Sequence, residues 1–343
     1  ELYKGQTNCP YWHGVFGGIY LHHLRNAVYE HLIKADRIID EIEYKDQDGW
    51  AGVKETDFYN RGAKAVILEN KDFFVSMDPE AGGVIRELDY KPKSANLVNT
   101  LARRGEFYHK KILERINNRI TEPVAIQEAI KTMDKRIKNG IFYDRYLRSC
   151  LVDHFIDKDL GLKDFADCNY TDRGDFAGAP YIARTENKGA ILSREAKVGD
   201  NLVAVLKRVS IVSDAEIEIS YILKNKGETD LDTFFGTEFN ISMPFADSDR
   251  YGYEADKKGL GRLDRAGAVP GTGSFSIKDA QHDMGVEFMF PERPEKVWYF
   301  PVMTVSQSER AYDFSYQSSC VFPIWDIRLG RGQEARLTIK WQV

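Results

Sequence analysis

Residues 5–18 hold the densest group of side chains that could do chemistry. The run reads Gly-Gln-Thr-Asn-Cys-Pro-Tyr-Trp-His-Gly-Val-Phe-Gly-Gly, with Tyr11, Trp12 and His13 consecutive. Glycine lets a backbone approach a ligand closely, an aromatic face suits the apolar face of a sugar ring, and an imidazole can hydrogen-bond hydroxyls. The pattern is therefore typical of a sugar-binding loop. A turn between a strand and a helix, in which Tyr11 and Trp12 simply pack, explains the same residues, and composition alone leaves both interpretations open.

A second group of polar residues recurs along a predicted strand. Glu238, Asn240 and Ser242 alternate with apolar residues, so they project from one face and could line a carbohydrate groove. A solvated outer face accounts for the same alternation and is the favoured interpretation. Asp175, in a Gly-Asp-Phe run, is interpreted as a turn or cap acid. The basic pairs within 103–111, Arg-Arg and then Lys-Lys, are interpreted as a solvated helix entrance rather than an anion site.

No metal or cofactor site is predicted. The four cysteines are too widely spaced for a disulfide framework or a zinc-binding Cys-x-x-Cys pair, which favours a reducing, cytoplasmic compartment. His22 and His23 are adjacent on a predicted helix and face apart, so they do not form a two-histidine site. Two calcium-like runs, 46–49 and 57–62, lack a complete set of oxygen ligands. Cys9 has no identifiable partner base, so an unreactive side chain is favoured over a nucleophile.

Length and charge exclude several classes of protein. The 343 residues carry 48 basic and 53 acidic side chains, a formal net charge of −5, which offers nucleic acid no broad positive field. No apolar stretch approaches the roughly 18 residues that cross a bilayer, and the first residues are not a signal peptide. We therefore expect a soluble protein with neither nucleic-acid nor membrane partners. The chain lacks an initiator Met and opens almost directly on the aromatic cluster, so further polypeptide is expected to precede it.

Hydrophobic periodicity predicts the elements that must position the aromatic cluster. From 19 to 39 the apolar residues recur at steps of three and four, which predicts one helix. Short apolar runs between turn residues predict strands after residue 43, and a helical island is expected at about 107–139. Beyond residue 190 a two-residue period dominates, as in 216–221 and 235–242, which predicts half-exposed strands. Since no helices alternate with these strands, the chain is predicted to be mainly β, a large antiparallel sandwich.

The aromatic cluster and the helix after it closely resemble the last sequence region of the catalytic barrel in glycoside hydrolase family 57. That family holds α-amylases and 4-α-glucanotransferases. The resemblance continues through an ordered series of motifs that match the C-terminal domain of such enzymes over nearly the whole chain. These motifs are Gly82-Gly83, Glu87-Leu88-Asp89-Tyr90, Asn96-Leu97, Asn99-Thr100-Leu101, Arg103-Arg104, Glu106, Tyr108-His109, Gly174-Asp175-Phe176, 235–240, 298–302, 304–308, Tyr316-Gln317 and Pro323-Ile324-Trp325.

The resemblance implies retaining cleavage or transfer of α-1,4-glucan, in which a Glu nucleophile and an Asp acid/base lie roughly 5 Å apart. In relatives both carboxylates come from barrel segments that precede the aromatic cluster, and nothing here matches those segments. No catalytic residue is therefore expected in this chain. Asn8, Tyr11, Trp12 and His13 are expected to contribute to the glucan cleft beside the absent pair. Several relatives place Asp-Ala where this chain has Cys9-Pro10, so a carboxylate near the sugar is lost.

The resemblance also implies a division of the chain. Residues 1–43 would end the barrel and add a helix, and 44–343 would form a C-terminal sandwich of the galactose-mutarotase-like type with a helical insertion at about 107–139. Because the first helix is expected to lack neighbours, it would expose an apolar surface to a barrel of the same protein or to a second copy of the chain.

Two functions remain open at this point. The chain is either the C-terminal part of a retaining α-glucan-active enzyme, or a non-catalytic carbohydrate-binding or structural module that supports a partner barrel. The expected ligand is α-glucan or a maltooligosaccharide in both cases. Hydrolase and transferase also remain open, because water and acceptor sugar would compete in a cleft built mostly elsewhere.

Overall fold

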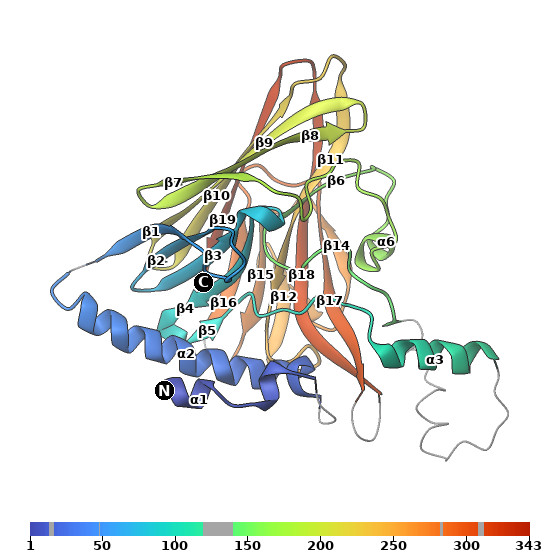
Figure 1. Ribbon diagram of the computed structural model, residues 1–343. Helices are drawn as coiled ribbons and strands as arrows, with labels where there is room; N and C mark the ends of the chain where they lie inside the picture. The colour runs from blue at the N-terminus through green and yellow to red at the C-terminus, as the bar shows by residue number, and fades with distance from the viewer. Residues whose placement is uncertain (14–16, 48, 119–139, 282–283, 308–311) are drawn as a thin grey trace.

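Strands dominate the fold, and their pairings are antiparallel throughout the part of the chain that is described. The computed structural model describes residues 1–13, 17–47, 49–118, 140–281, 284–307 and 312–343. Three sheets form a sandwich, and one long helix crosses beneath it (Figure 1). The prediction of a mainly β, antiparallel chain is confirmed. Within the described ranges, none of the helices combines the length and the apolar character needed to span a bilayer.

Within the residues that the structure describes, the helical elements are few and mostly short. They are α1 (Leu2–Gly5), η1 (Cys9–Tyr11), η2 (Gly18–Tyr20), α2 (His22–Glu43), η3 (Pro79–Ala81), η4 (Lys91–Lys93), α3 (Phe107–Asn118) and α6 (Leu162–Ala166). The predicted first helix is α2, which runs four residues further than the periodicity indicated. The predicted helical insertion is confirmed in α3, and its second half, 119–139, lies outside the described residues.

The strands fall into three sheets. The first five-stranded sheet has the order β1 (Ala51–Thr56), β2 (Ala65–Asn70), β3 (Phe73–Asp78), β4 (Val84–Tyr90), β5 (Ala95–Asn96). The nine-stranded sheet has the order β13 (Lys258–Arg262), β12 (Tyr251–Ala255), β15 (Ser274–Asp279), β16 (Met284–Met289), β19 (Glu334–Gln342), β10 (Glu216–Asn225), β9 (Asn201–Ser213), β8 (Gly189–Val198), β7 (Ile182–Glu186). The second five-stranded sheet has the order β14 (Gly267–Pro270), β17 (Lys296–Gln307), β18 (Tyr312–Leu329), β11 (Leu231–Ile241), β6 (Val152–Ile156).

Burial separates the strands into two kinds. One core cluster joins all three sheets, and a second cluster covers the opposite face of the second five-stranded sheet, where Phe322 stacks on Phe165 of α6 with ring centroids 4.2 Å apart. Strand β10 has the predicted alternation of buried and half-buried residues. Strand β11 is buried on both faces, so the prediction that 235–242 is a half-exposed strand is wrong. The near-continuous apolar run of β17 is the sequence pattern that such two-sided burial requires.

Helix α2 is held from two sides. The helix α1 packs on it, and β5, β18 and η4 contact it from the sandwich, so the prediction that the first helix lacks neighbours is wrong. Exposed apolar side chains nevertheless gather towards its C-terminal end, at Ile38, Ile39 and Ile42. The apolar stripe therefore serves the sandwich and α1 over most of the helix, and faces solvent only in its last turns.

Two carboxyl groups of β4 lie near α2, of which Asp89 is buried and Glu87 is half-buried. Glu87 and Asp89 project from the same side of the strand, and Asp36 and Tyr29 of α2 are their electrostatic neighbours. Burial, and then the charge of Asp36, raises the pKa of Glu87 from 4.5 to about 7. Burial and the charge of Glu87 raise the pKa of Asp89 well above its ordinary value. Both carboxyl groups are therefore protonated at a higher pH than they would be in water.

Replacing Glu87 by Gln is expected to stabilise the fold at alkaline pH. A carboxyl whose pKa is raised on folding favours the native state when protonated, so its contribution is lost as the pH rises from about 4.5 to about 7. The free energy of unfolding of Glu87→Gln should exceed that of the wild type by about 1–3 kcal/mol at pH 8, and the gap should close below pH 4.5. Urea unfolding across this range measures it, and a constant gap would contradict the buried-acid account.

Candidate functional site

The predicted sugar-binding residues form a compact loop at the end of the molecule where the chain begins. We call residues 8–13 the aromatic lip. Its centre is the single turn η1, with Pro10 at a position where a missing backbone N–H costs nothing. The Tyr11 hydroxyl donates to the carbonyl oxygen of Gly5 at 2.6 Å, which ties the lip to α1. The lip is therefore held by the turn of η1 and by this hydrogen bond rather than by burial of its rings.

The aromatic rings of the lip face solvent. Trp12 is 53% exposed and Tyr11 is 56% exposed, so neither ring is enclosed by the described part of this chain. The Trp12 carbonyl accepts a hydrogen bond from the Ile19 backbone N–H at 2.9 Å. Gly18 has a φ of +50°, and a Cβ there would lie 2.2 Å from that carbonyl oxygen, so only glycine fits. The glycines therefore fold the chain back on the lip and leave the indole free.

The other two predicted residues are placed differently from each other. His13 is half-buried, its Nε2 lies 3.2 Å from the Gln307 carbonyl oxygen, and its ring packs edge-on against Tyr20 and Tyr108 with centroids 5.0 and 5.6 Å away. Asn8 is exposed, and its backbone carbonyl accepts from the Tyr11 N–H at 3.2 Å. His13 therefore fixes the base of the lip, and Asn8 is accessible to a ligand.

A polar cluster that the sequence reasoning did not assign supports the lip from below. The Tyr20 hydroxyl donates to the Glu106 carboxylate, and burial together with this hydrogen bond raises the pKa of Tyr20 to about 12. The Glu106 backbone N–H donates to His109 Nδ1 at 3.3 Å, and His109 Nε2 lies 2.9 Å from the Val305 carbonyl oxygen. Because one nitrogen accepts and the other donates, His109 fits a neutral tautomer. The motif pair Tyr108-His109 with Glu106 was the signal available in the sequence.

A buried arginine joins the lip, α2 and the second five-stranded sheet. Arg25 donates through Nε to Asn99 Oδ1 at 2.9 Å and through Nη2 to Gln317 Oε1 at 2.8 Å. Its Nη1 donates to the carbonyl oxygen of Ile19, next to the lip. Burial lowers the pKa of Arg25 to about 10, so the guanidinium stays charged at neutral pH. This arginine clamp, Arg25 with Asn99 and Gln317, uses three residues from motifs that the family resemblance had picked out separately.

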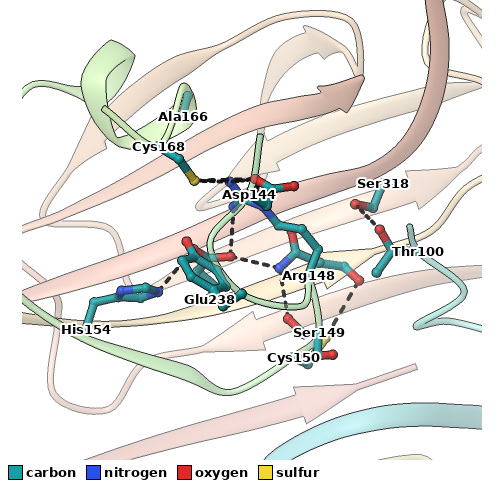
Figure 2. A network of polar contacts seen from close by, with 12 residues as sticks. Thr100, Asp144, Arg148, Ser149, Cys150, His154, Ala166, Cys168, Glu238 and Ser318 are labelled. Carbon is teal, nitrogen blue, oxygen red and sulfur yellow. Dashed lines mark hydrogen bonds and ion pairs between the residues drawn. The ribbon is translucent and has the colours of Figure 1, made fainter. Parts of the chain in front are cut away.

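A second polar network lies on the second five-stranded sheet, on the face that α6 and the 144–150 segment cover (Figure 2). We call it the Glu238 network. The Glu238 carboxylate accepts from Arg148 Nη1 and Asn240 Nδ2, each at 2.9 Å, and pairs with His154 Nε2 at 3.2 Å. Arg148 also bonds Asp144, which in turn accepts three hydrogen bonds from the Arg103 guanidinium and one from its backbone N–H. The side chains of Glu238, Arg148, Asp144 and His154 are fully buried.

Charge compensation keeps the Glu238 network ionised. Burial alone would raise the pKa of Glu238, but the charge of Arg148 and the contact with His154 outweigh it and lower this pKa to about 2. Burial would lower the pKa of His154, but Asp172 and Glu238 outweigh it and raise this pKa to about 9. A fully enclosed network in which every charge has a partner offers a substrate no access, so its role is to hold β6, β11 and the 144–150 segment together.

The network overturns two expectations. The solvated outer face predicted for Glu238, Asn240 and Ser242 is wrong, because α6 and the 144–150 segment cover that side of β11 and all three residues are buried. The solvated helix entrance is wrong for Arg103, which is 4% exposed and bound to Asp144. Among the described residues no three His, Cys, Asp or Glu side chains are grouped to hold a metal ion. Asp57 of one calcium-like run instead accepts the backbone N–H groups of Arg61 and Gly62.

Comparison with known proteins places these features in a family. Residues 57–339 match the model of the "Alpha-amylase/4-alpha-glucanotransferase, C-terminal" family, and residues 1–39 match that of the middle domain of the same enzymes. A 4-alpha-glucanotransferase of Thermococcus kodakarensis is 31% identical over 327 residues, which cover 94% of this chain and 45% of that protein. The chain thus spans about half the length of the curated relatives that it matches.

Solved structures agree with the sequence matches. The crystal structure of the 4-alpha-glucanotransferase of Thermococcus litoralis superposes with a TM-score of 0.78 at 27% identity and covers 99% of this chain and 45% of its own. A galactose mutarotase-like protein of Lactobacillus casei, at 10% identity and a TM-score of 0.53, covers 81% of this chain and 99% of its own, which shows the predicted galactose-mutarotase-like fold. With its sandwich matched over 57–339, the chain belongs to the alpha-amylase/4-alpha-glucanotransferase C-terminal domain family.

Proposed function

We propose that the chain is the C-terminal part of a longer enzyme of glycoside hydrolase family 57 that hydrolyses or transfers α-1,4-glucan by a retaining mechanism. The observation that carries the proposal is the match of the whole chain to fewer than half of the residues of glucan-active relatives. A retaining mechanism needs a carboxylate pair roughly 5 Å apart. The lip residues 8–13 include no carboxylate, and we propose that the pair lies on a barrel that precedes them.

The lip would form one side of the glucan cleft. Trp12 and Tyr11 would stack on sugar rings, Asn8 would hydrogen-bond a hydroxyl, and His13 would position the indole from behind. We propose the division expected from the sequence, with 1–43 completing the barrel and 44–343 forming the sandwich. Its support is the gap between the two family matches, which falls between residues 39 and 57. The exposed Leu2 and Tyr3 would meet the barrel or, in the isolated chain, a second copy.

A non-catalytic carbohydrate-binding or structural module is the second candidate. The observation in its favour is that the carboxylates of the Glu238 network are sealed and fully paired. Such a module would bind glucan at the lip and support a separate barrel without taking part in bond cleavage.

Replacing Trp12 by Ala tests the role of the lip. In a longer, active form, Trp12→Ala should lower kcat/KM on maltoheptaose about 10-fold, the equivalent of roughly 1.4 kcal/mol of lost stacking. Trp12→Phe should show a smaller drop in kcat/KM than Trp12→Ala, because it keeps an aromatic face. Phe58→Ala, which removes a 40% exposed ring on the β1–β2 side, is the matched control and should leave the kinetics unchanged. Unchanged kinetics in Trp12→Ala would mean that the lip does not contribute to the glucan cleft.

A further inference from the structure

A groove at the far end of α2 from the lip is not used by the proposed cleft. Its volume is about 490 Å³, within the range of about 300–1,000 Å³ that is usual for small-ligand sites. The last turns of α2 form one wall, and Trp50, Lys71 and Asp72 form the other. The 22 residues of α2 rise about 33 Å, so this groove and the lip lie at opposite ends of one rigid element.

An aromatic platform is built into the groove. Lys91 is buried, and its ammonium bonds Asp40 at 2.6 Å and Glu69 at 3.0 Å. The same ammonium lies over the indole of Trp50, 5.0 Å from the ring centroid. Trp50 in turn stacks on Tyr44 with centroids 3.9 Å apart and planes 12° from parallel. In the described part of the chain no other ring or cation contacts Tyr44, which is half-buried and lines the groove.

Uncommitted polar side chains surround the platform. Glu41, Lys45 and Gln47 line the groove, and within the described residues none of their side chains has a hydrogen bond or an ion pair. The cations and anions of the lining balance, since three basic residues face three acidic ones; these are Arg37, Lys45 and Lys71 against Asp40, Glu41 and Asp72. A balanced lining gives no net field to attract a phosphate or a nucleic acid. It favours a neutral ligand with many hydroxyl groups.

We propose that this groove is a second glucan-binding site, separate from the lip, in which a sugar ring stacks on Tyr44 and its hydroxyls bond Glu41, Lys45 and Gln47. The choice of an α-1,4-linked glucan rests on the proposed function. A long glucan that occupies both sites is bound by a second, intramolecular event, so affinity for polymer exceeds affinity for short oligosaccharides without any new contact. The site would hold the polymer while the lip presents its end to the cleft.

Titration of the folded 343-residue chain with maltoheptaose tests the site directly. The indole Nε1–H resonance of Trp50, assigned with Trp50→Phe, should shift on addition of the sugar. Tyr44→Ala should weaken the affinity measured from this shift at least 10-fold, and Tyr44→Phe should keep it. Trp12→Ala should not change it, because the lip lies at the other end of α2. Tyr3→Ala, which removes an 89% exposed ring outside the groove, is the control for a general loss of aromatic surface.

Amylose gel retardation provides the polymer readout. Retardation should fall in Tyr44→Ala and in Trp12→Ala and should be lost in the double variant, while thermal unfolding midpoints stay unchanged. A Trp50 resonance that does not move, equal binding by Tyr44→Ala and wild type, or equal binding of cellohexaose would each overturn the proposal. Conversion of maltoheptaose by a longer form without Tyr44-dependent binding would leave the proposed function intact and overturn only this site. Tyr44-dependent binding by the 343-residue chain, without conversion of maltoheptaose by the longer form, would overturn only the proposed function.

Discussion

Replacing Arg148 by methionine is expected to destabilise the fold by about 3–5 kcal/mol, since removing one partner of a buried ion pair leaves the other charge uncompensated. The carboxylates that would lose this partner are those of Glu238 and Asp144, both fully buried and both bonded to the Arg148 guanidinium. Chemical unfolding of the variant measures the loss. Lys163→Met, which breaks a solvent-exposed pair with Asp167, is the control and should leave stability nearly unchanged.

A double variant separates pairing from packing in the Glu238 network. Arg148→Met combined with Glu238→Gln removes one uncompensated charge, so it should be less destabilised than the sum of the two single variants. The network should also weaken in acid, because a lowered pKa contributes stability that is lost as the pH falls from 4.5 towards about 2. Strict additivity of the two single variants would mean that the groups do not interact and would contradict the network.

Arg25→Met is expected to show the second largest effect, a loss of about 2–4 kcal/mol together with a loosened lip. The methionine leaves Asn99 Oδ1, Gln317 Oε1 and the Ile19 carbonyl oxygen without their donor, and each unsatisfied buried group costs roughly 1–3 kcal/mol before relaxation. Hydrogen exchange of α2 amides should accelerate along with the drop in stability. Both changes are needed, because a merely structural residue elsewhere would lower stability without selective exchange at α2.

Arg25→Lys is the informative companion variant. Lysine keeps the charge but cannot place donors towards three separated acceptors, so it should recover less than half of the lost stability. Arg37→Met provides a control on the same helix, because Arg37 is half-buried and makes a 3.3 Å bond to the Lys91 carbonyl oxygen. Equal effects of Arg25→Met and Arg37→Met would contradict the clamp.

Local pattern predicted the elements more reliably than it predicted their surroundings. The steps of three and four residues along 19–39 and the alternation along β10 depend on one face of one element, and the structure has a helix at 22–43 and the alternation in β10. The alternation along β11 looks the same in sequence, but α6 and the 144–150 segment cover its polar side. Whether a polar residue faces water or a buried arginine depends on segments about 90 residues away, as for Glu238 and Arg148. The hydrophobic periodicity of one strand cannot predict a contact with a residue so far away in the sequence.

The site was predictable to a similar degree. Residue chemistry and the family resemblance picked out the lip, and the exposure of Tyr11 and Trp12 agrees with a binding surface. The supporting groups were visible only as scattered motif positions, because Tyr20 meets Glu106 across 86 residues and His109 meets Val305 across 196 residues. The groove at Tyr44 and Trp50 carried no motif at all, since its platform depends on the stacking of two rings on either side of a turn.

The measurement that tests the account most directly compares glucan conversion by two lengths of the polypeptide. Maltoheptaose is incubated with the 343-residue chain and, separately, with the longest natural form that contains it, and the products are resolved by chromatography. We expect the longer form to produce shorter or longer maltooligosaccharides and the 343-residue chain to produce none, because we propose that the carboxylate pair precedes the lip. Conversion by the 343-residue chain, or no conversion by the longer form, would contradict the account.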